Sequence, residues 1–468
     1  DDGLGGTIGE STSQLVITPV NDAPQMVSTA QPITYPENGP AVVIDGTVLV
    51  SDVDSGTFQG ATVAIVSGFR SGEDFLSYTP VWGIGGSWDG ASGVLTLSGA
   101  GSLADYHAAL RSVTYQVTAA AQENPTAGTR LVRMSINDGA LNSNTVSNTI
   151  TVVPVNDRPV VVAGGVLAYT EGDPARVLDG HIILTDPDSA SMEGVVVTAS
   201  GGYFANQDRL TFVDHWGIAS QWDAFTGTLT LSGHALRADY QAALRSITYW
   251  NSNGDIPTAG SRTWSFMVQD GDLTSLAATS QVTVTAVNDL PVLAAPDFRS
   301  VDEDTSLIFT SLTLQDPDVG TGLLKITLLA DHGTITLGST TQLQFLVGGD
   351  GSGAMVFTGQ LDAVAQALDG LRYQGVADFN GVDTLTLQVS DQGNAGSGPV
   401  GMAERNVIIL VQPVADPPVA GVDAFMTPED TPLLISTAQL LANDVDVDGN
   451  SLTVSVSLNV YHGTLTDL

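Results

Sequence analysis

The chain repeats itself with a period as long as a whole domain. Residues 82–115 (WGIGGSWDGASGVLTLSGAGSLADYHAALRSVTY) align almost residue for residue with residues 216–249 (WGIASQWDAFTGTLTLSGHALRADYQAALRSITY). A short Asn-Asp phrase that ends in proline recurs at Asn21, Asn156 and Asn288, at intervals of 135 and 132 residues. Such a period is too long for a small solenoid unit and fits a complete domain, so 468 residues accommodate about three or four domains.

Domain boundaries are expected directly after each Asn-Asp phrase. The prediction divides the chain into residues 1–24 (C-terminal end of a preceding repeat), 25–159 (repeat 1), 160–291 (repeat 2), 292–418 (repeat 3) and 419–468 (truncated start of repeat 4). Because both ends fall inside a repeat, we expect the chain to be part of a longer array. Any export signal would then lie outside this sequence.

Short segments rich in β-branched residues make up most of each repeat. Examples are ATVAIVSG, GVLTLSG and TRLVRMSI, which alternate apolar and polar residues between turns of Gly, Asp, Asn and Ser. About seven such strands per repeat predict an all-β fold of antiparallel β-sandwiches of immunoglobulin-like type. The segment SLADYHAALRSV (102–113) is the exception and predicts a helix of one or two turns.

The composition excludes several classes of partner. The formal net charge is −37, and Lys325 is the single lysine, so the surface repels nucleic acid and anionic membranes, whose binding requires clustered Lys and Arg. No apolar run approaches the roughly 20 residues that span a bilayer. The absence of cysteine excludes disulfides and thiolate metal sites, whereas a hydrophobic content of 43% excludes a disordered acidic tail.

Acidic residues recur in the same order in each repeat. A glutamate lies near the start, a D-x-D motif follows about fifteen residues later, an aspartate comes late in each complete repeat, and the Asn-Asp phrase closes it. These positions are Glu37, Glu171, Glu303 and Glu429; Asp52 with Asp54, Asp186 with Asp188, Asp316 with Asp318, and Asp444, Asp446 and Asp448; and Asp138, Asp270 and Asp391.

The D-x-D spacing places two carboxylates on one side of a strand, where it enters a loop. Carboxylates held this closely repel one another unless a cation neutralises them, and Ca²⁺ accepts six to eight oxygen ligands. The six histidines are scattered, so the sequence offers no cluster of ligands suited to Zn²⁺ or copper. Asp and Asn also favour turns, and any single motif is equally well explained as an acidic turn. The fixed order of four positions favours an ion site.

This ordered set of motifs resembles the calcium-binding signature of cadherin repeats. The repeats are similar to the cadherin-like and chondroitin-sulphate-proteoglycan-type tandem repeats of large bacterial adhesins and calcium-binding exoproteins, above all in PEDTPLLISTAQLLANDVDVDGNSLTV (428–454). The resemblance covers essentially the whole chain. It implies cadherin-like sandwiches arranged end to end as an extended rod, with Ca²⁺ at the junctions.

The resemblance also implies which residues of this chain hold the ions. Carried over by position, the ligand sets are Asn21, Asp22, Asp52, Asp54 and Asp138; Glu37, Asn156, Asp157, Asp186, Asp188 and Asp270; Glu171, Asn288, Asp289, Asp316, Asp318 and Asp391; and Glu303, Asp416, Asp446 and Asp448.

The chain departs from the cadherin pattern at two places. The mid-domain L-D-R-E motif is absent, and the second linker asparagine is replaced by Ala23, Arg158, Leu290 or Pro417. We therefore expect one or two ions per junction. The intact VNDLP linker should form a firmer junction than VNDRP, with its arginine, or VADPP, in which Ala415 replaces the asparagine.

Other chemistry has weaker support. Carboxylate pairs occur in glycosidases, but here they repeat in every unit beside linkers, and neither G-x-S-x-G nor H-E-x-x-H is present. The protein is therefore not expected to be an enzyme. Two motif pairs, Trp82 with Trp88 and Trp216 with Trp222, are explained either as platforms for sugar rings or as packed side chains, and packing is favoured.

The sequence thus predicts a non-catalytic, extracellular or cell-surface repeat array of a bacterial adhesin, stiffened by Ca²⁺. Its expected partners are calcium ions, with surface glycans or another adhesin as the adhesive target, and neither nucleic acid nor a membrane span. Two alternatives remain open: an array of carbohydrate-binding modules that uses the Trp motifs, and the spacer region of a secreted enzyme.

Overall fold

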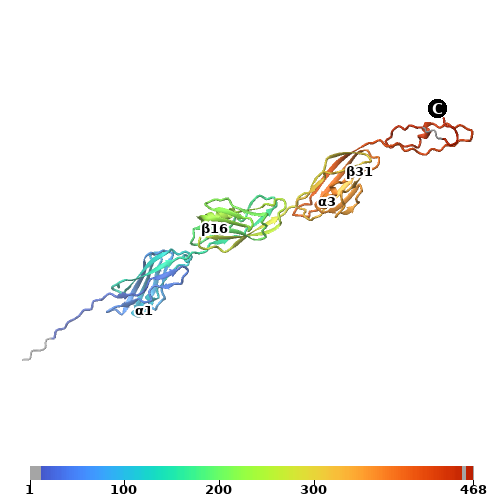
Figure 1. Cartoon of the computed structure of the whole chain (residues 1–468). Helices are drawn as coiled ribbons and strands as arrows, with labels where there is room; N and C mark the ends of the chain where they lie inside the picture. The colour runs from blue at the N-terminus through green and yellow to red at the C-terminus, as the bar shows by residue number, and fades with distance from the viewer. Residues whose placement is uncertain (1–11, 456–459, 467–468) are drawn as a thin grey trace, which may run out of the picture.

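Three β-sandwiches follow one another along the chain, and a C-terminal segment lies beyond them (Figure 1). This computed structural model describes residues 12–455 and 460–466. Residues 1–11 of the expected end of a preceding repeat, and residues 456–459 and 467–468 of the expected repeat 4, lie outside the described residues. No helix in the described part is long and apolar enough to cross a membrane.

Sandwich 1 contains eleven strands and one helix: β1 (Gln25–Val27), β2 (Ile33–Pro36), β3 (Val42–Val43), β4 (Leu49–Ser51), β5 (Thr57–Ser67), β6 (Asp74–Ser77), β7 (Gly85–Asp89), β8 (Val94–Ser102), α1 (Leu103–Arg111), β9 (Thr114–Val117), β10 (Gly128–Asn137) and β11 (Val146–Val153). A six-stranded sheet has the order β2-β11-β10-β5-β8-β7, and a three-stranded sheet has the order β3-β9-β6. Strands β1 and β4 form a separate pair.

Sandwich 2 repeats this topology with β12 (Val160–Val162), β13 (Val166–Thr170), β14 (Arg176–Val177), β15 (Ile183–Thr185), β16 (Ser191–Gly201), β17 (Asp208–Thr211), β18 (Ala219–Asp223), β19 (Thr228–Leu236), α2 (Arg237–Ser246), β20 (Thr248–Asn251), β21 (Gly260–Gln269) and β22 (Ala278–Thr285).

Sandwich 3 has the same order of elements: β23 (Val292–Ala294), β24 (Phe298–Asp302), β25 (Ser306–Ile308), β26 (Thr313–Gln315), β27 (Leu324–Ala330), β28 (Gly333–Thr336), β29 (Gln344–Val347), β30 (Ala354–Gly359), α3 (Leu361–Leu368), β31 (Arg372–Gly375), β32 (Gly381–Ser390) and β33 (Met402–Gln412). The C-terminal segment, residues 413–466, contains α4 (Thr437–Leu440) and a bridge between Val419 and Val445.

The predicted all-β fold of tandem antiparallel sandwiches is confirmed, and the structure adds detail. In each six-stranded sheet, the strand that comes first in the chain pairs parallel with the strand that comes last in the chain, as β2 does with β11. The other pairs are antiparallel. Each sandwich has eleven strands rather than about seven. The additional strands contain two to four residues, too few for an alternating pattern to identify.

The helix of each sandwich is longer than the predicted one or two turns. Helix α1 contains nine residues and begins with a capping box, in which the Ser102 side chain accepts from the Asp105 N–H and the Asp105 side chain accepts from the Ser102 N–H. Tyr106 and Leu110, two of the three predicted apolar positions, are fully buried. The third, Leu103, is partly buried and packs against the same core.

Each sandwich has its own hydrophobic core. The three clusters of buried residues extend over residues 26–152, 161–284 and 293–411. Strand β5 shows their origin, because Ala61, Val63 and Ile65 point inward while Thr62 and Val66 are exposed. Separate cores joined by short linkers concentrate the contacts between sandwiches at the junctions.

Candidate metal centres

Polar side chains meet at every linker, and at all but the most N-terminal linker they come from both neighbouring units. We name the sites the first to fourth junctions after their linker dipeptides, which are residues 21–22, 156–157, 288–289 and 415–416. The upstream glutamate comes from the turn after the first strand of the six-stranded sheet, such as β2, and the D-x-D motif follows a short strand, such as β15. The late aspartate follows the next-to-last strand, such as β21.

The backbone of the linker aspartate binds the second aspartate of the downstream D-x-D motif at all four junctions. The N–H groups of Asp22, Asp157, Asp289 and Asp416 donate to Oδ2 of Asp54, Asp188, Asp318 and Asp448, at 3.0, 3.0, 3.0 and 2.6 Å. Within the motif, Oδ1 of the first aspartate accepts from backbone N–H groups of the following turn, as Asp186 does from Asp188 and Ser189. The motif is therefore a turn that presents its carboxylates to the linker.

The linker asparagine binds the late aspartate wherever the asparagine is present. Nδ2 of Asn21, Asn156 and Asn288 donates to Oδ2 of Asp138, Asp270 and Asp391, at 2.8, 2.9 and 2.6 Å. Ala415 has no such group at the fourth junction. The asparagine thereby fixes the direction in which the linker enters the downstream sandwich.

The upstream glutamate accepts a hydrogen bond from the linker backbone. The N–H groups of Val155, Val287 and Val414 donate to Glu37, Glu171 and Glu303, at 2.7, 2.8 and 2.6 Å. The three glutamates thus lie at the junctions to which the sequence assigned them. The structure brings all the predicted residues together in these four groups, and their role as ligands stays a prediction.

Unpaired buried oxygens are concentrated at the junctions. Among the described residues, ten buried side-chain polar atoms lack a hydrogen-bond partner, and nine are oxygens of the predicted ligands. They are Asp52 Oδ2, Asp157 Oδ2, Asp186 Oδ2, Asp188 Oδ1, Asn288 Oδ1, Asp289 Oδ2, Asp316 Oδ2, Asp318 Oδ1 and Asp416 Oδ2. Asp186 and Asp316 are only 5% and 6% exposed. Because an unpaired buried carboxylate oxygen is costly, these atoms fit a hard cation.

The electrostatics of the junctions agree with this fit. Burial and, to a smaller extent, the neighbouring Asp188 raise the pKa of Asp186 to about 6. Burial and the neighbouring Asp318 likewise raise the pKa of Asp316 to about 6. Each raised pKa means that a negative charge is unfavourable there without a compensating positive charge.

Sequence reasoning missed an acidic position on the loop before β10, β21 and β32. The Glu123 carboxylate contributes to the raised pKa of Glu37 at the second junction, and Asp255 does so for Glu171 and Asp289 at the third. Asn124 Nδ2 donates to the Pro187 carbonyl at 2.7 Å, which ties this loop to the D-x-D turn of the next sandwich. The signal was present in the parallel phrases ENPTAG (123–128) and DIPTAG (255–260).

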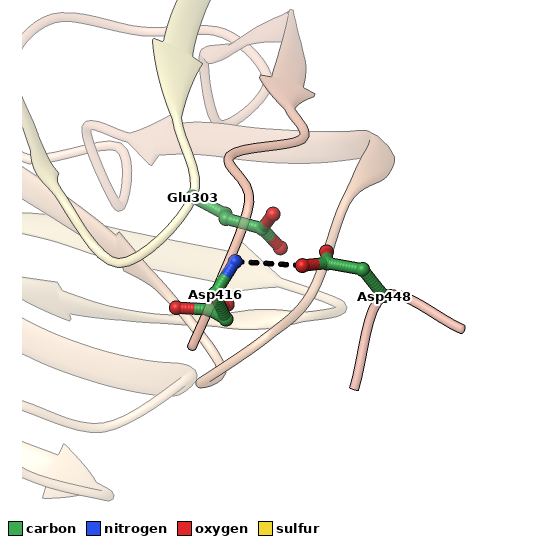
Figure 2. A group of neighbouring side chains, drawn as sticks. All are labelled: Glu303, Asp416 and Asp448. Atoms are coloured by element: carbon green, nitrogen blue, oxygen red, sulfur yellow. Dashed lines mark hydrogen bonds between the residues drawn. The ribbon is translucent and has the colours of Figure 1, made fainter. Parts of the chain in front are cut away.

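The fourth junction contains two groups of three carboxylates. Oxygens of Glu303, Asp416 and Asp448 lie within 4.8 Å of one another (Figure 2), and so do oxygens of Asp304, Asp378 and Asp416. Asp378 lies on the loop before β32, and Asp304 follows the predicted glutamate. Both were missed by the sequence analysis, and together they provide acidic groups at the junction that lacks the linker asparagine.

The third junction has an additional backbone connection. The loop after Asp391 is longer than its counterparts, and Ser397 forms a parallel bridge with Val287. The Ser397 N–H donates to the Ala286 carbonyl at 2.8 Å, and the Asn288 N–H donates to the Ser397 carbonyl at 3.0 Å. Gly396 permits this approach, because its φ is +67° and a Cβ there would lie 2.4 Å from the Val287 carbonyl carbon.

This connection predicts a junction that keeps its structure without ions. In chelated protein, we expect the amides of Asn288 and Ser397 to remain protected in hydrogen exchange, whereas the Asp157 amide, which binds only a carboxylate, loses protection. The variant Gly396→Ala should remove the protection of Asn288. The control is Gly349→Ala, since a Cβ at Gly349 meets nothing within 4 Å. Equal exchange at both junctions in chelated wild type would contradict the prediction.

The C-terminal part of the chain is similar to a known protein family. Residues 414–468, which include Asp416, Asp446 and Asp448, match the family model of the cadherin-like domain. The predicted resemblance to cadherin-like repeats is confirmed. The matched segment begins at the linker of the fourth junction, so the cadherin-like region includes the downstream half of that site.

One curated relative and several solved structures are similar to this chain. Halomucin of Haloquadratum walsbyi is 29% identical over 136 residues, which are 27% of this chain and 2% of halomucin. The protocadherin gammaB7 EC3-6 cis-dimer structure covers 83% of this chain and 77% of its own, with 14% identity and a TM-score of 0.30. Mouse cadherin-23 EC22-24 covers 84% and 100%, with 15% identity and a TM-score of 0.28.

Proposed function

We propose that this chain is a non-catalytic, calcium-binding repeat array that serves as the stiff stalk of an adhesin on a bacterial surface. The observation that supports the proposal most strongly is the set of nine unpaired buried oxygens at the junctions. Carboxylate and amide oxygens are ligands that Ca²⁺ prefers, and its flexible coordination of six to eight oxygens suits turns of unequal sequence.

Each ion would be shared between two structural units. At the second junction, Glu37 comes from the upstream sandwich, Asp157 from the linker, and Asp186 and Asp188 from the downstream sandwich. A bound Ca²⁺ supplies positive charge that offsets the repulsion among these carboxylates. Since the ligands converge only when the linker has its observed conformation, binding stabilises that conformation over bent alternatives.

The residue roles follow from their contacts. The D-x-D turn and the linker aspartate provide eight of the nine unpaired oxygens, and Asn288 provides the ninth. The linker asparagine and late aspartate bind each other and orient the linker. The upstream glutamate holds the linker backbone, and Glu123, Asp255 and Asp378 add negative charge from the preceding loop. Without ions, the carboxylates repel one another, and the chain is expected to bend at its junctions.

An acidic, cysteine-free chain of this kind suits an extracellular position, where calcium is abundant. The adhesive partner is either a surface glycan or another adhesin. Small-angle X-ray scattering with calcium and with EDTA tests the proposal, because the maximum dimension should decrease when the ions are removed.

A further inference from the structure

The two tryptophans of the motif in sandwich 1 have different environments. Trp88 packs edge-on against Phe69 and Phe75, at centroid distances of 6.2 and 5.9 Å. Trp82, in contrast, is 96% exposed. The expectation that these side chains pack is confirmed for Trp88 and wrong for Trp82. Packing therefore explains one tryptophan of the pair and leaves the other without a structural role.

The backbone that carries Trp82 is held in a tight hairpin. Val81 and Ile84 form an antiparallel bridge, and the buried Ile84 anchors the turn to the core. Gly99 permits β8 to approach the hairpin, since a Cβ there would lie 2.1 Å from the Gly83 carbonyl oxygen. The exposed indole is thus attached to a fixed support, which lowers the entropy cost of binding a ligand.

An uncharged depression lies beside this hairpin, on the outer face of the six-stranded sheet. Its volume is about 250 Å³, and none of its lining residues is ionisable. The polar side chains in it are those of Gln59, Thr62, Thr96, Ser98, Ser135, Asn137 and Asn142. Ser98 on β8 pairs with Gly85 of β7, directly after the hairpin, so the depression and the Trp82 hairpin lie at neighbouring positions along β8.

A β-bulge accounts for the depression. The pairing of β5 with β8 shifts register between Phe58 and Gly60, and Gly60 leaves space where a side chain would stand. A Cβ at Gly60 would lie 3.2 Å from the Leu97 carbonyl oxygen. Among the described residues, the hydroxyl groups of Thr62, Thr96, Ser98 and Ser135 have no hydrogen-bond partner in the protein, so they are available to a ligand.

We propose that this face of sandwich 1 binds an uncharged glycan. One sugar ring stacks its C–H face on the Trp82 indole, and the hydroxyls of a neighbouring ring bond to the side chains of the depression. The lining of the depression supports this class, because its hydroxyl and amide groups match a polyhydroxyl ligand. In a chain with a net charge of −37, such a neutral lining is a distinctive feature.

Sandwich 2 provides a natural comparison. Trp216 occupies the position of Trp82 but is only 41% exposed and lies against His215 at a centroid distance of 4.4 Å. The equivalent face carries a hydrogen bond between Glu193 Oε1 and His234 Nδ1, at 2.5 Å, together with Met267. We therefore assign glycan binding to sandwich 1 and not to sandwich 2.

Binding of the full chain, in calcium, to an array of uncharged oligosaccharides of glucose, mannose, galactose and N-acetylglucosamine tests the assignment. The best array ligand is then titrated by calorimetry into wild type, Trp82→Ala and Trp216→Ala. We expect Trp82→Ala to weaken binding about tenfold or more, as loss of aromatic stacking predicts. Its melting temperature should not change, because the side chain is exposed. Trp216→Ala should bind like wild type.

Three results would overturn the assignment. They are a wild-type chain that binds no uncharged glycan or only acidic ones, equal binding by Trp82→Ala, and an equal loss in Trp216→Ala. None of them bears on calcium at the junctions, because Trp82 belongs to no junction, so failure here is distinguishable from failure of the proposed stalk function.

Discussion

Replacing Asp316 with asparagine should greatly weaken calcium binding at the third junction. Asp316 is 6% exposed, and its Oδ2 has no partner, so the substitution removes a ligand and the charge that attracts the ion. At a calcium concentration 100 times the Kd, a bound ion stabilises the folded protein by about 2.7 kcal/mol. Calorimetric titration and thermal melting with and without calcium should show that this contribution of the third junction is lost.

In ion-free protein, the same substitution should not lower the melting temperature. The raised pKa of Asp316 reflects an unfavourable buried charge, so the neutral asparagine should melt at the same temperature as wild type or slightly higher in EDTA. Asp297→Asn is the matched control, because Asp297 is an exposed aspartate of the same sandwich. This variant should bind calcium like wild type. Asp186→Asn should repeat the result at the second junction. Undiminished calcium binding in both variants would contradict the assigned sites.

Replacing Arg130 with methionine should destabilise sandwich 1 by about 3–5 kcal/mol, because it leaves a buried carboxylate without its partner. Arg130 Nε lies 3.0 Å from Asp74 Oδ1, and both side chains are almost fully buried. The Tyr115 hydroxyl also donates to Asp74, at 2.6 Å. Urea unfolding followed by tryptophan fluorescence should show one transition at a lower urea concentration.

Two variants separate this effect from a general loss of charge. Arg133→Met removes an exposed arginine of the same strand and should change stability by less than about 0.5 kcal/mol. The double variant Asp74→Asn, Arg130→Met removes both charges and should recover part of the loss. Arg130 Nη2 also donates to the Thr126 carbonyl at 3.0 Å, on the loop that carries Glu123. The single variant should therefore also weaken calcium binding at the second junction.

Sandwich 3 stabilises a buried carboxylate without an arginine. Asp383 takes the place that Arg130 has in sandwich 1, and it accepts from the Tyr373 hydroxyl at 2.7 Å and from the His332 N–H at 3.0 Å. Its carboxylate is thus stabilised by hydrogen bonds rather than by an arginine. This difference identifies the third repeat as the divergent one in its core as well as in its surface loops.

Periodicity identified most of the features that recur, and it failed for those that do not. The acidic positions repeat in order, so the four groups at the junctions could be predicted from that order together with the resemblance to cadherin repeats. The Ser397 connection occurs in one repeat, so no comparison between repeats reveals it. Glu123 does recur as Asp255, but it lies far in sequence from Glu37, and only the folded loop brings its charge to the junction.

The local sequence pattern also fails to predict the exposure of single side chains and the number of strands. The residues around Trp82 and Trp216 are similar, yet Trp82 is fully exposed and Trp216 is partly covered by His215, because single neighbours decide side-chain burial. Strands of two to four residues, such as β3, are fixed by pairing with β9 rather than by their own alternation. The number of strands therefore depends on contacts between distant segments.

The shape of the whole chain in solution tests the central claim most directly. Small-angle X-ray scattering should give a longer maximum dimension in calcium than in EDTA at equal ionic strength, with magnesium as a control for charge screening. The double variant Asp186→Asn, Asp316→Asn should show a reduced response to calcium. The same pair-distance distribution for wild-type protein in calcium and in EDTA would contradict the proposal that shared ions stiffen the junctions.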